Sequence, residues 1–312
     1  DRLSVTTVDA GGTEPLHIVC GAPNVAAGQV VAVALPGTMV FHGNEQFEIR
    51  KSKIRGQLSE GMICAEDELG LGNDHEGIMV LDGNARIGMP AAEYFGVTTD
   101  TIFEIGLTPN RIDCSSHFGV ARDLAAFYNL RRPVRAKLPE IAGFSKDRDR
   151  GVINVTVEAP DACIRYSGLT VRGIKVGPSP AWLQTRLRAI GLNPINNVVD
   201  ITNFVLHETG QPLHAFDASA ITGDTVRVRH LPDKTKFVTL DGVERTLSSS
   251  DLMICNRDEG MCIAGVFGGL RSGVTEATTD LFLESATFSP VSVRRTSRRH
   301  DLHTDASYRF ER

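Results

Sequence analysis

At 312 residues the chain exceeds the size of one ordinary domain, so we expect two or three domains. Apolar residues make up 41% and charged residues 23%, the usual balance of a globular protein in water. No apolar run reaches the roughly 20 residues of a membrane helix, which excludes a helical membrane anchor. The net charge of −5 excludes a globally basic surface for nucleic acid, although residues 294–303 form one local basic patch.

The chain ends and the cysteines bound the cellular context. The chain has no initiator Met and begins in strand-like sequence, so we expect a piece of a longer polypeptide without a signal peptide. Its cysteines form no C-x-x-C pair, so we expect buried, reduced thiols of a cytosolic protein and no zinc site. The six cysteines are Cys20, Cys64, Cys114, Cys163, Cys255 and Cys262.

Residues 1–95 have the pattern of a small all-β domain. Short apolar runs alternate with Gly, Pro and Asn turns, and about five such strands suit a barrel of the OB type. Residues 1–90 carry twelve Asp and Glu against six Lys and Arg, a net charge of −6. The predicted strands cover Leu16–Cys20, 30–35, 61–65 and 78–81.

Residues 96–150 predict a small α/β segment followed by a linker. Residues 102–107 are strand-like, and a helix is predicted to start at Ser115 or Ser116, because serine is a good N-cap. Residues 131–151 are charged and contain two prolines, which is typical of a linker. The apolar face of the helix consists of Val120, Ala121, Leu124, Ala125 and Tyr128.

Residues 151–312 predict an α/β domain with three helices. The first is capped at Ser179, ends at Gly191 and buries an apolar stripe; the second covers 198–208, and the third opens at Ser289. The stripe of the first helix is Trp182, Leu183, Leu187 and Ile190. The predicted strands are 153–157, 166–171, Thr225–His230, 236–240, 245–247, Leu252–Cys255, 262–267 and Asp280–Phe288.

One glutamate stands where a core residue is expected. Because side chains alternate along a strand, Glu284 shares a face with Phe282 and Ala286, and both faces of Asp280–Phe288 are at least partly apolar. A buried carboxylate costs several kcal/mol unless it is hydrogen-bonded. Glu284 is therefore either a structural ion-pair partner or a functional group.

Two neighbouring features have a structural and a functional interpretation. His214 follows a helix end, where it either completes a turn or orients a water or a ribose hydroxyl. The segment 265–269 (GVFGG) either forms a bulge or brings backbone N–H groups close to a ligand.

The segment 300–307 combines two histidines with two aspartates, yet we expect no metal there. Its spacing fixes no third ligand, and the adjacent Arg298 and Arg299 oppose a cation. The sequence contains neither a G-x-S-x-G nucleophile elbow nor a Walker A loop. Any hydrolysis would therefore use a positioned water and no covalent nucleophile.

A series of motifs in one order resembles the β subunit of bacterial phenylalanyl-tRNA synthetases, and it spans nearly the whole chain. The motifs are 18–24 (IVCGAPN), 53–56 (KIRG), 59–62 (SEGM), 108–111 (TPNR), 119–123 (GVARD), 199–203 (VDITN), 210–217 (GQPLHAFD), 267–269 (FGG) and 303–307 (HTDAS).

The resemblance implies a multidomain α+β protein with three parts. Residues 1–95 correspond to an OB-fold tRNA-binding domain without its first strand, and 96–150 to part of a small α/β domain with a linker. Residues 151–312 correspond to a three-layer β/β/α editing domain. The family assembles two α and two β chains in the cytoplasm without a membrane, and the whole complex uses ATP and Mg²⁺ to charge phenylalanine tRNA. The fragment itself is expected to need no cofactor or metal.

The resemblance also implies an editing site that hydrolyses tyrosine wrongly attached to phenylalanine tRNA. The implied catalytic residues are His214 and Thr304, and the implied substrate-binding residues are Glu284, Gly268, Ala306, Pro212, Thr202 and Asn203.

The physical logic of editing agrees with a buried carboxylate. A synthetic site shaped for Phe cannot strongly reject the same ring with an added hydroxyl, whereas a carboxylate accepts a hydrogen bond from that hydroxyl and leaves Phe beside an unpaired charge. The alternative is a non-catalytic scaffold for tRNA docking and subunit assembly, because Asn193 stands where many members of the family carry Arg. An RNA-free metabolic enzyme is the third interpretation.

Overall fold

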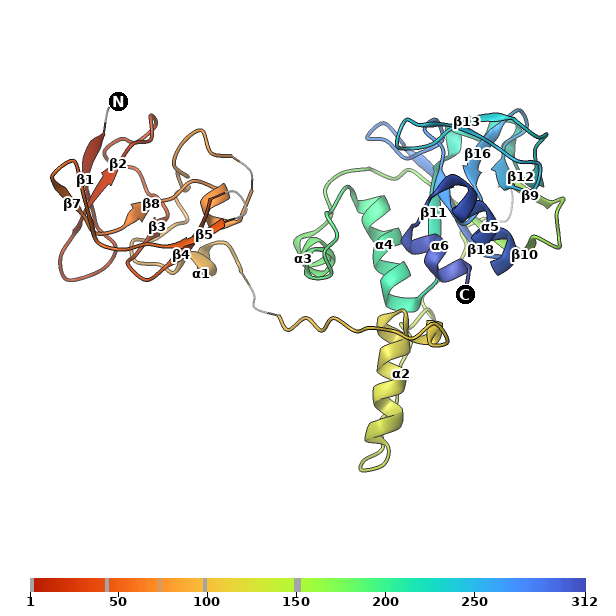
Figure 1. Cartoon of the computed structure of the whole chain (residues 1–312), viewed down its shortest axis with the longest axis horizontal. Helices are drawn as coiled ribbons and strands as arrows, with labels where there is room; N and C mark the ends of the chain where they lie inside the picture. The colour runs from red at the N-terminus through yellow and green to blue at the C-terminus, as the bar shows by residue number, and fades with distance from the viewer. Residues whose placement is uncertain (1–2, 43–44, 73, 98–99, 149–152) are drawn as a thin grey trace. The chain divides into compact units, whose positions relative to one another are not determined.

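The computed structural model describes residues 3–42, 45–72, 74–97, 100–148 and 153–312. The chain divides into two compact units, Asp1–Thr101 and Ile102–Arg312, and each folds around its own apolar clusters (Figure 1). No helix among the described residues combines the length and the hydropathy needed to span a bilayer.

The first unit is built from short antiparallel strand pairs. The described strands pair as β1 with β2, β3 with β8, β4 with β5 and β6 with β7. Alternation explains the core, because Ile18 and Cys20 of β2 are buried, whereas His17 is exposed and Val19 is half-buried. The bounds are β1 Ser4–Val8, β2 Leu16–Cys20, β3 Val33–Ala34, β4 Met39–His42, β5 Glu45–Glu48, β6 Ser52–Ile54, β7 Gln57–Ser59 and β8 Met62–Ile63, with the helices η1 Asp67–Leu69 and α1 Ala91–Tyr94.

The strand prediction for this unit is correct in place and wrong in length. Leu16–Cys20 is confirmed, whereas the runs 30–35 and 61–65 shorten to β3 and β8. The run 78–81 contributes only a single bridge, between Val31 and Val80. The pairs therefore form a β domain of the OB type without one continuous ladder through the described strands.

The second unit opens with an extended segment and a projecting helix. Residues 102–107 form no strand, because none of the strands that the structure describes pairs with them, and Phe103 is 78% exposed. The helix α2 (His117–Tyr128) follows the short η2 (Ile112–Cys114), and Ser116 is its N-cap, accepting a hydrogen bond from the Gly119 N–H. Of the predicted apolar face only Ala125 is buried. The cap prediction is therefore confirmed, whereas most of the predicted apolar face is not buried.

Two sheets form the body of the second unit. A three-stranded sheet has the order β10-β18-β11, and a five-stranded sheet has the order β17-β16-β15-β12-β9. The hairpin β13-β14 forms its own two-stranded pair, and the bridge between Thr239 and Gly269 links it to the chain after β17. The bounds are β9 Asn154–Val157, β10 Cys163–Arg172, β11 Leu213–Asp217, β12 Thr225–His230, β13 Lys236–Val238, β14 Glu244–Thr246, β15 Leu252–Cys255, β16 Gly260–Ile263, β17 Phe267–Gly268 and β18 Asp280–Phe288.

The alternation along β18 places this strand between two cores. Phe282, Ala286 and Phe288 belong to the large cluster that also holds residues of β12, β15 and β16, so this face meets the five-stranded sheet. Leu281 and Leu283 on the other face pack with Val198 of helix α4 (Asn197–Thr209). The three-stranded sheet therefore has a second sheet on one face and a helix on the other (Figure 1).

The helices of this unit begin and end near the predicted residues. The helix α3 (Ala181–Ala189) begins one residue late, because Pro180 is its N-cap and the Ser179 hydroxyl instead donates to buried Asp200. Leu183 and Leu187 are buried as predicted, but Trp182 is 59% exposed. The remaining helices are α4 Asn197–Thr209, η3 Ala218–Ala220, η4 Thr222–Asp224, α5 Pro290–His300 and α6 Asp305–Phe310.

Candidate functional site

Glu284 lies at the centre of the three-stranded sheet and points between the two sheets. In the strand register it stands opposite Gly168 of β10 on one side and His214 of β11 on the other. The residue is 5% exposed. Its Oε2 accepts a hydrogen bond of 2.6 Å from the Tyr166 hydroxyl. The carboxylate therefore has a neutral phenol as its partner, and the ion pair of the structural interpretation is not formed among the described residues.

The absence of a side chain at Gly168 allows this hydrogen bond. A Cβ at this position would overlap the ring of Phe282, which occupies the space in front of the glycine. The Tyr166 ring stacks on the Phe282 ring, with centroids 6.5 Å apart and planes 14° apart. Tyr166 stands opposite Ala286 in the register, one diagonal step from Glu284 on the same face. Packing and register thus direct the Tyr166 hydroxyl to the carboxylate.

The electrostatics of this pair depend on burial. Burial raises the pKa of the Glu284 carboxyl to about 7. The hydrogen bond from Tyr166 has the opposite, smaller effect and lowers this pKa. Burial and the neighbouring carboxylate raise the pKa of the Tyr166 phenol well above its usual value. Tyr166 is therefore a permanent donor near neutral pH, whereas Glu284 titrates there.

His214 lies beside Glu284 on β11 and is half-buried. Its ring packs edge-on against Phe216, with centroids 4.4 Å apart. Burial lowers the pKa of His214 to about 4, so the imidazole is neutral at pH 7. A neutral ring has one donor and one acceptor nitrogen, and it can orient a water molecule or a hydroxyl group.

Gly268 brings the five-stranded sheet close to His214. A Cβ at Gly268 would stand 3.0 Å from His214 Cε1 and 2.7 Å from Leu240 Cδ1, so a larger residue would displace both side chains. The Gly268 carbonyl accepts a hydrogen bond from the Leu240 N–H at 3.0 Å. The fold thus places Glu284, His214 and Gly268 together, although they come from three separate strands.

Thr304 lies at the start of α6, where it caps the helix. Its Oγ1 accepts a hydrogen bond from the Ser307 N–H and donates one to the Val266 carbonyl, each at 3.0 Å. The hydroxyl proton is thereby engaged by the segment that precedes Gly268. Ala306, two residues further along α6, is half-buried.

Pro212, Thr202 and Asn203 all belong to the chain before β11. Pro212 is buried directly before the strand, and the Gln211 amide spans the Pro212 and Ala286 carbonyls. Thr202 and Asn203 are half-buried on α4, and the Thr202 hydroxyl donates to the Val199 carbonyl of its own helix. Among the described residues, neither Thr202 nor Asn203 forms a hydrogen bond with His214 or Glu284.

Sequence reasoning missed Tyr166 and Gly168. They lie 118 and 116 residues before Glu284, and nothing in the local pattern of residues 166–171 indicates which strand will pair with them. The sequence offers one indication of their role, a tyrosine and a glycine two residues apart on the same face of a strand. Such a combination is too common in sheets to identify a site.

No group of three His, Cys, Asp or Glu side chains converges on one point among the described residues, so we assign no metal ligands. His300 has another role, because its Nε2 lies 2.8 Å from Asp251 Oδ2. Arg299 and Thr296 contact the same buried aspartate. This network joins α5 to the five-stranded sheet.

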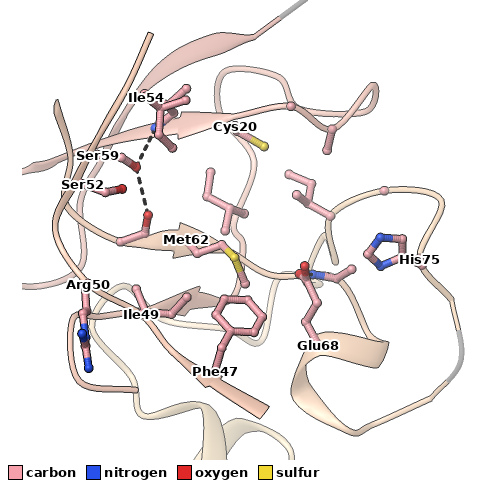
Figure 2. A pocket seen from close by; sticks show the side chains of 18 of the residues that line it. Cys20, Phe47, Ile49, Arg50, Ser52, Ile54, Ser59, Met62, Glu68 and His75 are labelled. Carbon is pink, nitrogen blue, oxygen red and sulfur yellow. Dashed lines mark hydrogen bonds between the residues drawn. The ribbon is translucent and has the colours of Figure 1, made fainter. Parts of the chain in front are cut away.

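The first unit contains a cavity of about 650 Å³. Figure 2 shows Arg50 at one end of it and His75 at the other, with Phe47 and Met62 between them. His75 contacts the Asp67 carboxylate, which raises the pKa of His75, and Arg50 forms an ion pair with Glu48, so both basic side chains already have acidic partners. A smaller cavity of about 280 Å³ in the second unit is lined by Thr170, Arg172 and three aspartates.

Comparisons with known proteins identify both units. The family described as a putative tRNA binding domain matches residues 1–90, and the B3/4 domain family matches residues 162–312. A tRNA-binding domain joined to a B3/4 domain defines a chain of the aminoacyl-tRNA synthetase class.

Similar curated proteins give the particular family. The chain is similar over its whole length to phenylalanine–tRNA ligase β subunits from Porphyromonas gingivalis (59% identical), Bacteroides fragilis (58%) and Salinibacter ruber (49%). It spans only 38%, 38% and 39% of these relatives, respectively. The chain belongs to the family of bacterial phenylalanine–tRNA ligase β subunits, of which it covers little more than a third.

A solved structure is also similar. It is an N-terminal fragment of the phenylalanyl-tRNA synthetase β subunit from Pyrococcus horikoshii, 14% identical over 61% of this chain and 59% of its own. Its TM-score of 0.35 is too low to define the fold.

Proposed function

We propose that the second unit edits mischarged tRNA by hydrolysing tyrosine from phenylalanine tRNA at the site around Glu284. The observation that carries the proposal is a buried carboxylate with a neutral phenol as partner, placed beside His214 and Gly268. A structural glutamate of a core would be paired with a cation, because an unpaired buried charge is costly. The family membership of the chain supports this assignment.

Selectivity follows from the chemistry of the carboxylate. The ionised form of Glu284 is an acceptor only, so it can receive the hydroxyl proton of a tyrosyl ring. A phenylalanyl ring in the same place would leave the charge without that partner, a penalty on the order of 1–3 kcal/mol. Ala306 and Pro212 are small enough to form walls of the ring pocket, while Thr202 and Asn203 are proposed to contact the tRNA end.

Hydrolysis in this proposal uses a positioned water. The neutral His214 ring orients that water, or a ribose hydroxyl, toward the ester carbonyl. A group with a pKa of about 4 is a weak general base at pH 7, so orientation is its main contribution. Thr304 positions the Gly268 segment through the Val266 carbonyl, which replaces the direct catalytic role expected from the sequence.

The rest of the assignment extends to the whole protein. We assign residues 1–95 to tRNA binding, 96–150 to a partial α/β domain with a linker, and 151–312 to editing. The short strand pairs of the first unit would close into an OB barrel. The full chain would assemble as two α and two β subunits in the cytoplasm, with ATP and Mg²⁺ used for aminoacylation by the complex. None of the editing steps requires these cofactors.

The test is a deacylation assay with the full-length chain in its native complex. Tyrosyl-tRNA and phenylalanyl-tRNA, both on phenylalanine tRNA, are compared side by side. We expect tyrosine to be released much faster than phenylalanine. Equal rates, no greater than spontaneous hydrolysis, would refute the editing function.

A non-catalytic scaffold is the second candidate, and one observation favours it. The segment 102–144 exposes several large apolar side chains, as expected of a surface that another polypeptide covers. These side chains are Ile102, Phe103, Ile105, Leu124, Phe127, Leu130, Leu138, Ile141 and Phe144. Assembly and editing would use different residues, so one chain could do both. The deacylation assay decides whether the site around Glu284 is catalytically active.

A further inference from the structure

The two oxygens of the Glu284 carboxylate are in different situations. Oε2 accepts the 2.6 Å hydrogen bond from Tyr166. Oε1 accepts no hydrogen bond from the described residues. It keeps some accessible surface, because it is not one of the fully covered side-chain atoms without a partner. Oε1 therefore remains open to a ligand atom, whereas Oε2 is occupied by the protein.

The Tyr166 side chain is held firmly in this arrangement. Its ring stacks on Phe282, and the glycine at position 168 leaves the space that Phe282 fills. The phenol is a reliable donor, because its own proton is lost only far above neutral pH. The hydrogen bond from Tyr166 thus fixes the carboxylate through one oxygen. Its donor is a rigidly held phenol, the same chemical group that the tyrosyl substrate carries.

We propose that Tyr166 is a specificity-determining positioning residue, which occupies Oε2 of Glu284 and directs Oε1 at the hydroxyl of an incoming tyrosyl ring. The inference rests on the editing function proposed above. Tyr166 contacts neither the ester nor the water in this scheme. Its effect is on the choice between tyrosine and phenylalanine, and it acts through the carboxylate.

The protonation of Glu284 makes this role measurable. The titratable neighbours that interact with it are Cys163 and Tyr166 of β10 and Cys262 of β16, with His214 beside it on β11. The pKa of Cys163 is raised to about 11, that of Cys262 is raised well above its usual value, and that of His214 is lowered to about 4. These neighbours remain neutral near pH 7, where Glu284 titrates.

The direction of the pH effect follows. Only the ionised carboxylate penalises a phenylalanyl ring, so selectivity rises as pH increases through the Glu284 pKa. The Tyr166 hydrogen bond lowers that pKa. Tyr166→Phe removes the hydrogen bond but keeps the stacked ring, so the Glu284 pKa rises and selectivity develops at a higher pH.

The first experiment measures kcat/KM for tyrosyl- and phenylalanyl-tRNA from about pH 6 to 9, with the full-length chain in its native complex. The ratio of the two cancels the hydroxide dependence that both esters share. For Tyr166→Phe we expect the ratio at pH 7 to fall roughly tenfold and its midpoint to rise by about one pH unit. Tyr128→Phe, which removes an exposed phenol on α2, is the matched control and should match wild type.

Two outcomes separate this inference from the editing proposal. If wild type itself does not prefer tyrosyl-tRNA, the editing function fails. If wild type is selective and Tyr166→Phe has the same ratio and midpoint, the role of Tyr166 is refuted. In a Glu284→Gln background, adding Tyr166→Phe should change the ratio no further, because the carboxylate through which it acts is gone.

A second measurement does not depend on the folding of a variant. A structure of the wild-type protein with adenosine that carries tyrosine through a non-hydrolysable 3′-amide would show the ligand directly. We expect the ligand hydroxyl on Oε1 while Tyr166 remains on Oε2. A ligand hydroxyl that displaces Tyr166 from Oε2, or that binds away from Glu284, would overturn the proposal.

Discussion

Glu284 is the residue whose burial has the clearest consequence. Its strand, its face and its neighbours Phe282 and Ala286 could be predicted from alternation alone. Its hydrogen-bond partner could not, because Tyr166 reaches it through a long-range strand pairing. The local sequence therefore predicts that a polar group is buried, whereas only the fold determines which group satisfies it.

Replacing Glu284 by Ala should abolish most of the preference for tyrosine. The change removes the acceptor and its charge, so we expect a 10- to 150-fold loss of the Tyr/Phe rate ratio, from roughly 1.5–3 kcal/mol. The ratio and the melting temperature are both measured, with exposed Glu276→Ala as control. A lower melting temperature with an unchanged ratio would make Glu284 purely structural.

Replacing His214 by Ala should slow hydrolysis and leave selectivity intact. Because the neutral ring orients a water, we expect a loss of roughly 10- to 100-fold, below the 10²–10⁴ typical of general acid–base groups. The wild-type rate should also show no His214 titration near pH 7, since its pKa is about 4. His303→Ala, which alters an exposed histidine, is the control. A collapse of selectivity at an unchanged rate would contradict this role.

At the scale of elements, the sequence predicts local structure well and partners poorly. The strands Thr225–His230, Leu252–Cys255 and Asp280–Phe288 have the expected bounds, because alternating or continuous apolar patterns are local properties. The burial of Trp182 on α3 was wrong, because burial depends on which elements pack against a helix. The short helix α6 was missed for lack of a periodic apolar pattern.

The start of α6 shows how a cap can support a site. Thr304→Ala removes the acceptor for Ser307 and the donor to Val266, so we expect about 1 kcal/mol of destabilisation. For a unit of this size the melting temperature should fall by about 2–4 °C. Thr304→Ser keeps the hydroxyl and should resemble wild type. Lost hydrolysis in Thr304→Ala at an unchanged melting temperature would instead favour direct catalysis by this hydroxyl.

At the scale of the whole molecule, the charged network around Asp251 leads to a test of metal dependence. His300 is held by Asp251, and Arg299 contacts the same carboxylate, so this region is a structural network unsuited to a cation. We therefore expect deacylation by the full-length protein to survive chelation. The assay is run before and after chelator treatment, with aminoacylation by the complex as the Mg²⁺-dependent control. Loss of deacylation that zinc restores would revive a metal site.

The free energy of unfolding should depend on pH through the ionisation of Glu284. Its pKa is raised from 4.5 to about 7 on folding, so between these pH values the native state binds more protons than the unfolded state. Stability then falls as pH rises through this window, by up to about 3 kcal/mol, and the loss is complete above the folded pKa.

Glu284→Gln has no carboxyl to ionise, so its stability should lack this decline. Denaturant unfolding of both proteins from about pH 4 to 8 measures the difference, with exposed Glu276→Gln as the control. We expect Glu284→Gln to gain on wild type as pH rises and to be the more stable protein at pH 8, while it loses tyrosine selectivity. If the stabilities of the two proteins changed in parallel with pH, Glu284 would ionise as freely in the folded protein as in the unfolded chain. The proposed selectivity, which depends on a buried charge, would then be refuted. A gain in stability coupled to a loss of selectivity would instead identify Glu284 as a residue retained for function at a cost to the fold.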